Sequence, residues 1–362
     1  MKLHLIVVMG SLVLSTAKAY EIPVVCQTRA QSTVLDNSLQ SNATAGICQA
    51  LVAGESRELY LGASDANPVY LNVLQYFSID TFAMMARGRQ KLSDVPSLDY
   101  ALNATEQIVA RRAKINLDEI HNVDDFLRAA GTLLGTKVNF RHYDVVMSTN
   151  LASDNPQTMT IDPATYDRIK RNPYLYTYDK VEDTDTSKVR ISISYLYIGK
   201  IQRLLQEKKL VLDAKTTKTI LAMDRNAGDY KLEIQRTAYQ TALRALISNL
   251  FNDQSSLTAF ELYQHYMAIH PFHDGNGRTG RLFYEWIRHH KNGEEHKVGL
   301  PLYDMDLLSS RTAPEQLAAG AAIHQWVAQA KSNDEFLARS DAALKALMEI
   351  FPELKTTFSE LL

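Results

Sequence analysis

The stretch from residue 270 to residue 281, His-Pro-Phe-His-Asp-Gly-Asn-Gly-Arg-Thr-Gly-Arg, constrains this chain more than any other. It combines histidine, a carboxylate, closely spaced glycines and two arginines. Gly275 and Gly277 lack a Cβ, so their backbone N–H groups can approach an anion closely. Arg278 and Arg281 carry planar guanidinium groups, which suit phosphate oxygens. The stretch therefore predicts a site for a phosphate-bearing ligand.

The sequence on either side predicts that this stretch is the elbow between two helices. Thr258 and Glu261 have the spacing of a capping box, and Pro271 would end the helix that they begin. A second helix, starting near Gly275 and ending near residues 288–291, is indicated by apolar residues at helical spacing: Leu282, Phe283, Trp286 and Ile287. The glycines and arginines would then lie at a helix N-terminus, which favours anions.

Two residues of the stretch could carry chemistry on a nucleotide. Asp274 is a hard oxygen ligand of the kind that Mg²⁺ takes beside nucleotide phosphates. His270 can accept a proton near neutral pH, although a lone histidine at this place would be expected to cap the helix. A transition-metal site of His265, His270, His273 and Asp274 is an alternative, but it leaves the glycines and arginines unexplained.

The stretch resembles the signature of Fic-domain proteins, H-P-F-x-[D/E]-G-N-G-R-x-x-R, and every specified position matches. A weaker likeness lies upstream, where Gly228-Asp229-Tyr230-Lys231 is similar to the Gly-x-Tyr-Arg start of the family's flap hairpin. The resemblance covers about residues 190–330. It implies a mainly α protein with the Fic fold, a helical bundle with a small β-hairpin flap. Residues 20–185 resemble no family and are expected to be α or α+β.

Fic enzymes transfer AMP, usually from ATP, to a Ser, Thr or Tyr hydroxyl of a target protein. By position, the resemblance makes His270 the general base, Asp274 the Mg²⁺ ligand and Phe272 the residue that pins the loop to the core. It assigns nucleotide binding to Gly275, Asn276, Gly277, Arg278 and Arg281. It assigns docking of the target by strand addition to the flap residues Tyr230, Leu232 and Ile234.

Other activities remain open at this point. The Fic fold could move UMP or phosphocholine, or remove AMP, or the protein could be a secreted nucleotide-binding module without turnover. Many relatives carry an inhibitory helix, [S/T]-x-x-x-E-[G/N]. Here only Thr356 and Glu360 have that spacing, and Leu361 follows, so at most a degenerate inhibitor is expected.

Residues 1–19 have the pattern of a signal peptide cleaved after Ala19. Lys2 precedes an apolar run, and Ala-Lys-Ala ends the segment. Secretion or periplasmic export is expected, with an uncleaved anchor as the alternative. Cys26 and Cys48, the two cysteines, would pair in such an oxidising space, or else remain free thiols. The full chain has a formal net charge of −2, and loss of Lys2 and Lys18 makes it more acidic, which excludes general nucleic-acid binding.

The rest of the chain suggests four parts. The signal peptide is followed by residues 20–185, by the Fic domain at 190–330 and by a C-terminal helix at 331–362. Within the second part, a helix capped by Asn122 and stopped by Gly135 precedes a strand-like segment at 137–147. The polar residues 180–188 are expected to be a linker and the domain boundary. Later, a hairpin is expected at 228–234, and helices are expected at 239–251, from Pro314 and from a cap at Asn333.

Overall fold

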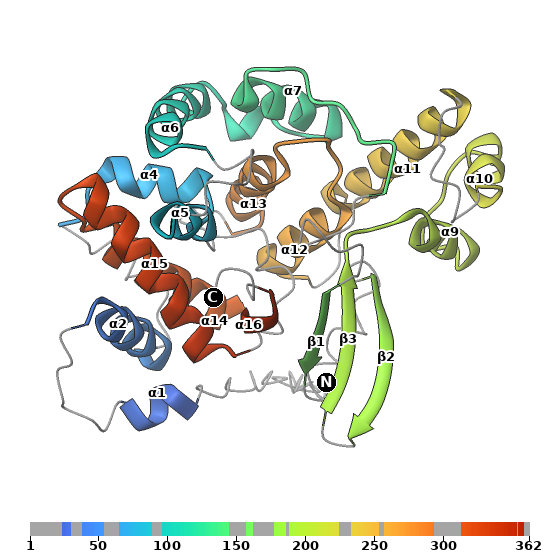
Figure 1. Ribbon diagram of the computed structural model, residues 1–362. Coiled ribbons are helices and arrows are strands. Elements are labelled where there is room, and N and C mark those ends of the chain that lie inside the picture. Colours follow the sequence, from blue (N-terminus) through green and yellow to red (C-terminus); the bar gives the residue numbers. More distant parts are fainter. Residues whose placement is uncertain are drawn as a thin grey trace, which may run out of the picture.

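Helices make up most of the part of the chain that the structure describes (Figure 1). Two hydrophobic cores hold them together. The mainly α fold predicted from the sequence is therefore confirmed. The structure is a computed structural model of the chain. It describes residues 24–29, 38–53, 65–88, 96–144, 157–161, 177–185, 188–223, 233–252, 257–292, 313–352 and 354–357.

The first core lies in the bundle that carries the motif. Its elements are α6 (Leu98–Arg112), the 3-10 turn η1 (Leu117–Glu119), α7 (Val123–Leu134), α9 (Ile198–Gln206), α10 (Ala214–Leu221), α11 (Glu233–Phe251), α12 (Ala259–Ile269) and α13 (Asn276–Asn292). At its centre, the rings of Phe126, Tyr266 and Phe283 pack with centroids 5.0–5.8 Å apart. Burying each ring stabilises the fold by roughly 1.5–3 kcal/mol. Because α6 and α7 contribute to this core, part of the predicted N-terminal region belongs to the motif's bundle.

The second core joins the two ends of the chain. Its elements are α1 (Val24–Arg29), α2 (Leu39–Ala53), α4 (Pro68–Tyr76), α5 (Ile79–Ala86), α14 (Ala313–Ala328), α15 (Asn333–Ile350) and α16 (Leu354–Thr357). In Figure 1, α15 crosses α5 and α2. The ring of Tyr70 stacks on the ring of Phe336, and the ring of Phe82 meets Phe336 edge to face. Helix α14 was expected in the Fic domain, but its apolar residues pack here against N-terminal helices.

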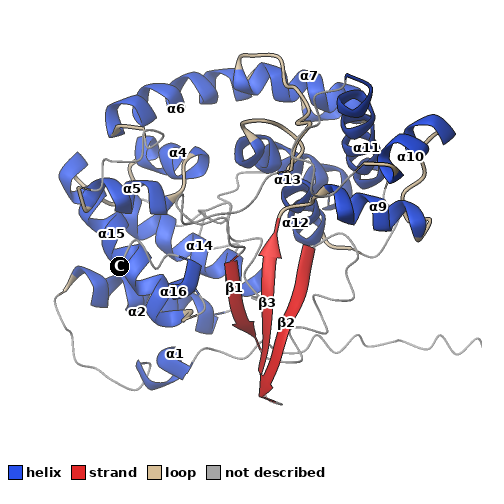
Figure 2. Ribbon diagram, turned by 45° about the vertical axis from the view of Figure 1, so that its right-hand side comes forward, coloured by secondary structure: helices blue, strands red, loops and turns tan. Residues whose placement is uncertain are grey.

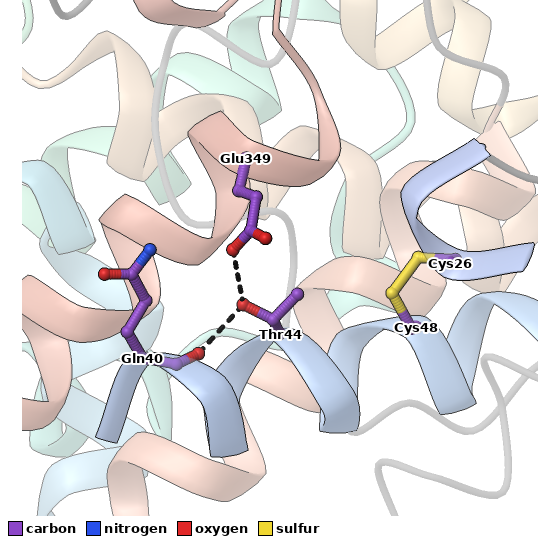
Figure 3. Close-up of a disulfide and its surroundings, with 5 residues drawn as sticks. All are labelled: Cys26, Gln40, Thr44, Cys48 and Glu349. Carbon is purple, nitrogen blue, oxygen red and sulfur yellow. Dashed lines mark hydrogen bonds between the residues drawn. A yellow bond between two sulfur atoms is a disulfide. The ribbon is translucent and has the colours of Figure 1, made fainter. Parts of the chain in front are cut away.

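A disulfide and a buried hydroxyl hold α2 in the second core (Figure 3). Cys26 of α1 and Cys48 of α2 are bonded, the pairing expected from the sequence, with Cα atoms 5.0 Å apart. The Thr44 hydroxyl lies 2.8 Å from the Gln40 carbonyl and 3.1 Å from the Glu349 carboxylate. These contacts tie α1 and α15 to neighbouring turns in the middle of α2.

A three-stranded antiparallel sheet extends from the helices (Figure 2). Its strands are β1 (Gln157–Ile161), β2 (Thr177–Asp185) and β3 (Lys188–Ser194), in the order β1-β3-β2. The predicted linker at 180–188 is therefore wrong, because these residues lie mostly in the β2–β3 pair. The missed signal is the alternation of Val, Ile and Ile with polar residues in β3, which is typical of a strand. The helical pattern expected after residue 190 begins only at α9.

Several helix ends match their predictions. Thr258 and Glu261 form both hydrogen bonds of the capping box. Asn122 accepts from two N–H groups at the start of α7, and Gly135 ends that helix in the left-handed conformation at φ 69°. The cap of α15 is Ser332 rather than Asn333.

Two strand predictions are not met in the residues that the structure describes. Within the described part of 137–147, the ladder contact is a single bridge between Phe140 and Phe272. Ile234 lies in the first turn of α11 rather than in a hairpin. Tyr230 and Leu232, the other flap residues, lie outside the described residues, as do residues 1–19 and Glu360. Across the part of the chain that the structure describes, no helix has the length and apolar character needed to cross a membrane.

Candidate functional site

Helix α12 delivers His270 to the elbow of the motif. Pro271 cannot continue the helix, because its ring removes the backbone donor. His270 is the C-cap, at φ 45° and ψ 62°, and its N–H donates to the Tyr266 carbonyl at 3.1 Å. This left-handed conformation is rare for a residue with a side chain and requires surrounding contacts that hold it.

The elbow is closed by Asn276 and Phe272. The Phe272 N–H donates to Asn276 Oδ1 at 2.8 Å, and Asn276 Nδ2 donates back to the Phe272 carbonyl at 2.9 Å. The Phe272 ring is buried and lies 5.4 Å from the ring of Phe140. Phe272 thus anchors the loop in the core, as the resemblance implied. The amide of Asn276 serves the loop itself, so any part of Asn276 in anion binding falls to its main chain.

Close packing fixes the start of α13. Gly275 has φ +80°, and a Cβ built there would lie 2.6 Å from Leu134 Cδ1. A Cβ on Gly280 would lie 2.5 Å from Met267 Sδ, so α12 and α13 cross at short range. At this crossing the Tyr266 hydroxyl donates to Thr279 Oγ1 at 2.7 Å. Packing alone therefore requires a glycine at both Gly275 and Gly280.

The imidazole of His270 is held neutral. Its Nδ1 is buried and has no hydrogen-bond partner among the described residues, although the residue as a whole is half-buried. Burial, aided by the nearby charge of Arg141, lowers the pKa of His270 to about 3. At neutral pH the ring can therefore accept a proton, but it is a weak base in this state.

Asp274 and Arg278 lie at the open side of the elbow. The Asp274 side chain is 91% exposed, and it lies 3.2 Å from Arg278 Nη2 in an ion pair. Its Oδ1 also accepts the Gly275 N–H at 2.6 Å. A solvent-facing carboxylate beside a helix N-terminus can coordinate a hard cation together with phosphate oxygens.

Arg281 is the buried cation of the site. Its residue is 5% exposed, and its Nε has no hydrogen-bond partner among the described residues. Glu285 lies one turn further along α13, but it pairs with Arg112 at 2.7 Å. Within the described part of the chain, no carboxylate forms an ion pair with Arg281. A buried guanidinium without a counter-charge is costly unless an anion joins it.

Arg281 also acts on residues of α4 and α14. Burial raises the pKa of Tyr76 in α4 to about 12, and the charge of Arg281 opposes that rise. Burial lowers the pKa of His324 in α14 to about 4, and Arg281 lowers it further. Helices α4 and α14, from the N-terminal and C-terminal parts of the chain, therefore both lie near Arg281.

The remaining residues of the motif lie in the first turn of α13 or on the surface. Gly277 and Thr279 are buried in the first turn of α13. His273 is exposed, and its Nδ1 lies 3.2 Å from the Tyr143 hydroxyl. Among the described residues, no three His, Cys, Asp or Glu side chains gather as a metal site would require, so the transition-metal alternative has no support there.

Two residues near His270 were missed by the sequence reasoning. Tyr195 stacks on the His270 ring, with centroids 4.0 Å apart. Arg141 is fully buried and donates to the His270 carbonyl at 2.7 Å. Neither residue lies in a motif, and a single arginine in a polar segment carries no sequence signal of burial.

The comparisons with known proteins agree with the motif. The sequence model of the Fic/DOC family matches residues 200–288, which include all of the elbow. A comparison with curated proteins and one with solved structures each found no match. The family match indicates a Fic-fold transferase. Together with the capped helix and the closed elbow, it shows that residues 200–288 of the chain form a Fic domain.

Proposed function

We propose that the protein is an adenylyltransferase, which moves AMP from ATP to a Ser, Thr or Tyr hydroxyl of a target protein. The observation that carries the proposal is Arg281, a 5% exposed guanidinium with no carboxylate partner among the described residues. Arg281 lies within two turns of the N-terminus of α13, which is flanked by Gly275 and Gly277. Backbone N–H groups and the helix dipole also favour an anion there. ATP phosphates would supply Arg281 with a counter-charge.

The residues have distinct roles in this reaction. His270 takes the proton from the target hydroxyl, and the hydroxyl oxygen forms a bond to the α-phosphorus. The bond from that phosphorus to the oxygen bridging to the β-phosphate breaks, and pyrophosphate leaves with the electron pair. Arg278 and Arg281 hold the outer phosphates through charge-assisted hydrogen bonds. Asp274 would hold Mg²⁺, which when bound offsets charge on the phosphate oxygens.

The low basicity of His270 is compatible with this role only if the substrate changes it. A pKa of about 3 in the free protein makes the imidazole a poor acceptor. Bound phosphates place negative charge nearby, and an opposite charge favours the protonated form. We therefore expect the pKa of His270 to rise when ATP binds.

The low pKa of His270 favours a second candidate, a nucleotide-binding module without turnover. If His270 stays a weak base with ATP bound, binding would occur without transfer. The two candidates are separated by incubating the protein with a lysate, magnesium and ATP, and measuring the intact masses of the proteins. A mass increase of one AMP group on a protein supports transfer. ATP binding without a modified protein supports the module. Labelling by UMP or phosphocholine donors in place of ATP would change the assigned group.

We further propose that the protein is exported. The Cys26–Cys48 disulfide supports this, since disulfides persist in secreted and periplasmic spaces. The signal-like segment at residues 1–19 supplies the route. N-terminal sequencing of exported material should begin at Tyr20. Protein that keeps Met1 and stays in the cytosol would contradict the proposal.

A further inference from the structure

Arg141 makes an unusual number of contacts for a side chain outside the motif. It is 0% exposed, and all five of its side-chain N–H donors meet oxygen atoms at 2.6–3.0 Å. Four acceptors are main-chain carbonyls, those of Tyr143, Leu196, Ile269 and His270. The fifth is the Tyr239 hydroxyl. Such a group fixes the chain segments that it joins.

Two of these contacts, and a third from the Arg141 main chain, act at the end of α12. Arg141 Nε donates to the His270 carbonyl at 2.7 Å, and Nη2 donates to the Ile269 carbonyl at 3.0 Å. The Arg141 main-chain N–H donates to the Pro271 carbonyl at 2.9 Å. These carbonyls have no partner within the helix, and a cation at a helix C-terminus is favourable. Arg141 therefore holds the left-handed turn at His270.

A further side-chain contact of Arg141 reaches the other side of the imidazole. Arg141 Nη2 donates to the Leu196 carbonyl at 2.6 Å, and the Leu196 N–H donates to the Ala268 carbonyl at 2.8 Å. Tyr195, the preceding residue, stacks on His270 at 4.0 Å. One guanidinium thus fixes the main chain on both sides of the ring pair.

The charge of Arg141 is balanced indirectly. The Tyr239 hydroxyl accepts from Arg141 and lies 2.6 Å from Asp144 Oδ1. The same carboxylate oxygen accepts the Ile198 N–H at 2.9 Å, which fixes the start of α9. Buried polar groups joined in this way have few alternative arrangements. The network is therefore suited to fixing one geometry.

We propose that Arg141 is the positioning residue for His270: through main-chain carbonyls it sets the orientation of the imidazole toward the target hydroxyl. This inference rests on the proposed function, because its catalytic test measures AMP transfer. Arg141 precedes the matched segment 200–288, so the N-terminal region supplies a part that the Fic domain needs. Lysine cannot replace it, since an ammonium group is a compact donor that cannot reach all of these carbonyls.

The test compares Arg141→Met and Arg141→Lys with the parent protein. Arg87→Met is the matched control, since Arg87 is a part-buried arginine that pairs with Asp341 in the second core. We expect Arg141→Met to lower kcat for AMP transfer by about 100-fold, the scale of an ångström-level misplacement. Its ATP affinity should stay within a few-fold, because Arg141 does not touch the nucleotide residues. The kcat of Arg141→Lys should lie between the values for Arg141→Met and the parent. Arg87→Met should keep the parent's kcat.

A second readout does not require activity. The NMR resonance of the His270 ring, assigned with His270→Gln, should move in Arg141→Met and Arg141→Lys. The resonance of His324, buried in the second core, should stay in place in the same spectra. If the parent transfers nothing, the proposed function fails, and the His270 resonance alone decides the role of Arg141. An unmoved His270 resonance, an unchanged kcat, or a joint loss of ATP affinity and of the His324 resonance would overturn the inference.

Discussion

The ring of Tyr195 covers the imidazole of His270, with centroids 4.0 Å apart and planes inclined by 33°. Tyr195 lies between the end of β3 and the start of α9, so the sheet leads directly to His270. An aromatic ring at this distance removes water from one face of the imidazole. Desolvation is the main cause of the low pKa of His270, and Tyr195 contributes to it.

Replacing Tyr195 with Ala should raise the pKa of His270 from about 3 toward the ordinary value of about 6.5. Water then reaches the ring and stabilises its charged form. Tyr195→Phe keeps the ring and should leave the pKa low. An NMR titration of the His270 ring measures both variants, and an equally low pKa in Tyr195→Ala would contradict the assigned cause.

Gly275→Ala should destabilise the protein by about 1–3 kcal/mol, because the residue has φ +80° and the new Cβ would lie 2.6 Å from Leu134 Cδ1. Gly46→Ala is the control. Gly46 lies inside α2, and a Cβ there meets nothing within 4 Å. That change should stabilise the helix by roughly 0.5–1 kcal/mol. Urea denaturation measures both, and similar effects of the two substitutions would refute the packing argument at Gly275.

Arg281→Met should have opposite effects on stability and on binding. Removing a buried cation that has no counter-charge among the described residues should stabilise the ligand-free protein by roughly 1–3 kcal/mol. The loss of a charge-assisted contact should weaken ATP binding by about 1.5–3 kcal/mol.

The control for Arg281 is Arg278→Met, which removes a more exposed arginine that is already paired with Asp274. It should change the stability of the ligand-free protein by less than about 0.5 kcal/mol. Thermal unfolding and calorimetry with ATP give the two quantities. A lower unfolding temperature for ligand-free Arg281→Met would mean that a counter-charge is present.

His324 should make the fold sensitive to acid. Its pKa is lowered to about 4 by burial, whereas the unfolded chain binds the proton near pH 6.5. Protons therefore favour the unfolded state between these values, and stability is lost as pH falls from about 6.5 to about 4. One unit of pKa difference corresponds to about 1.4 kcal/mol of stability. His324→Asn should therefore abolish roughly 3 kcal/mol of the loss of stability between these pH values. Denaturation curves at several pH values test this, and an unchanged slope in the variant would contradict it.

The motif and its two helices were predictable because their signals are local. A capping box, a proline stop and helical spacing act within a few residues, and α12 and α13 follow them. The sheet was missed because residues 180–188 are polar, and composition outweighed the alternation in β3. The second core could not be foreseen, because it joins α2 and α5 to α15 across most of the chain. Arg141 was missed for the same reason: its partners lie up to 129 residues away.

The most direct test of the central claim follows the fate of the α-phosphate. The parent protein and His270→Ala are incubated with target lysate, magnesium and ATP radiolabelled at either the α- or the γ-phosphorus. We predict that only the α-label enters protein, that His270→Ala transfers none, and that both proteins bind ATP with similar affinity in calorimetry. Incorporation of the γ-label, or transfer by His270→Ala near the parent rate, would contradict the account.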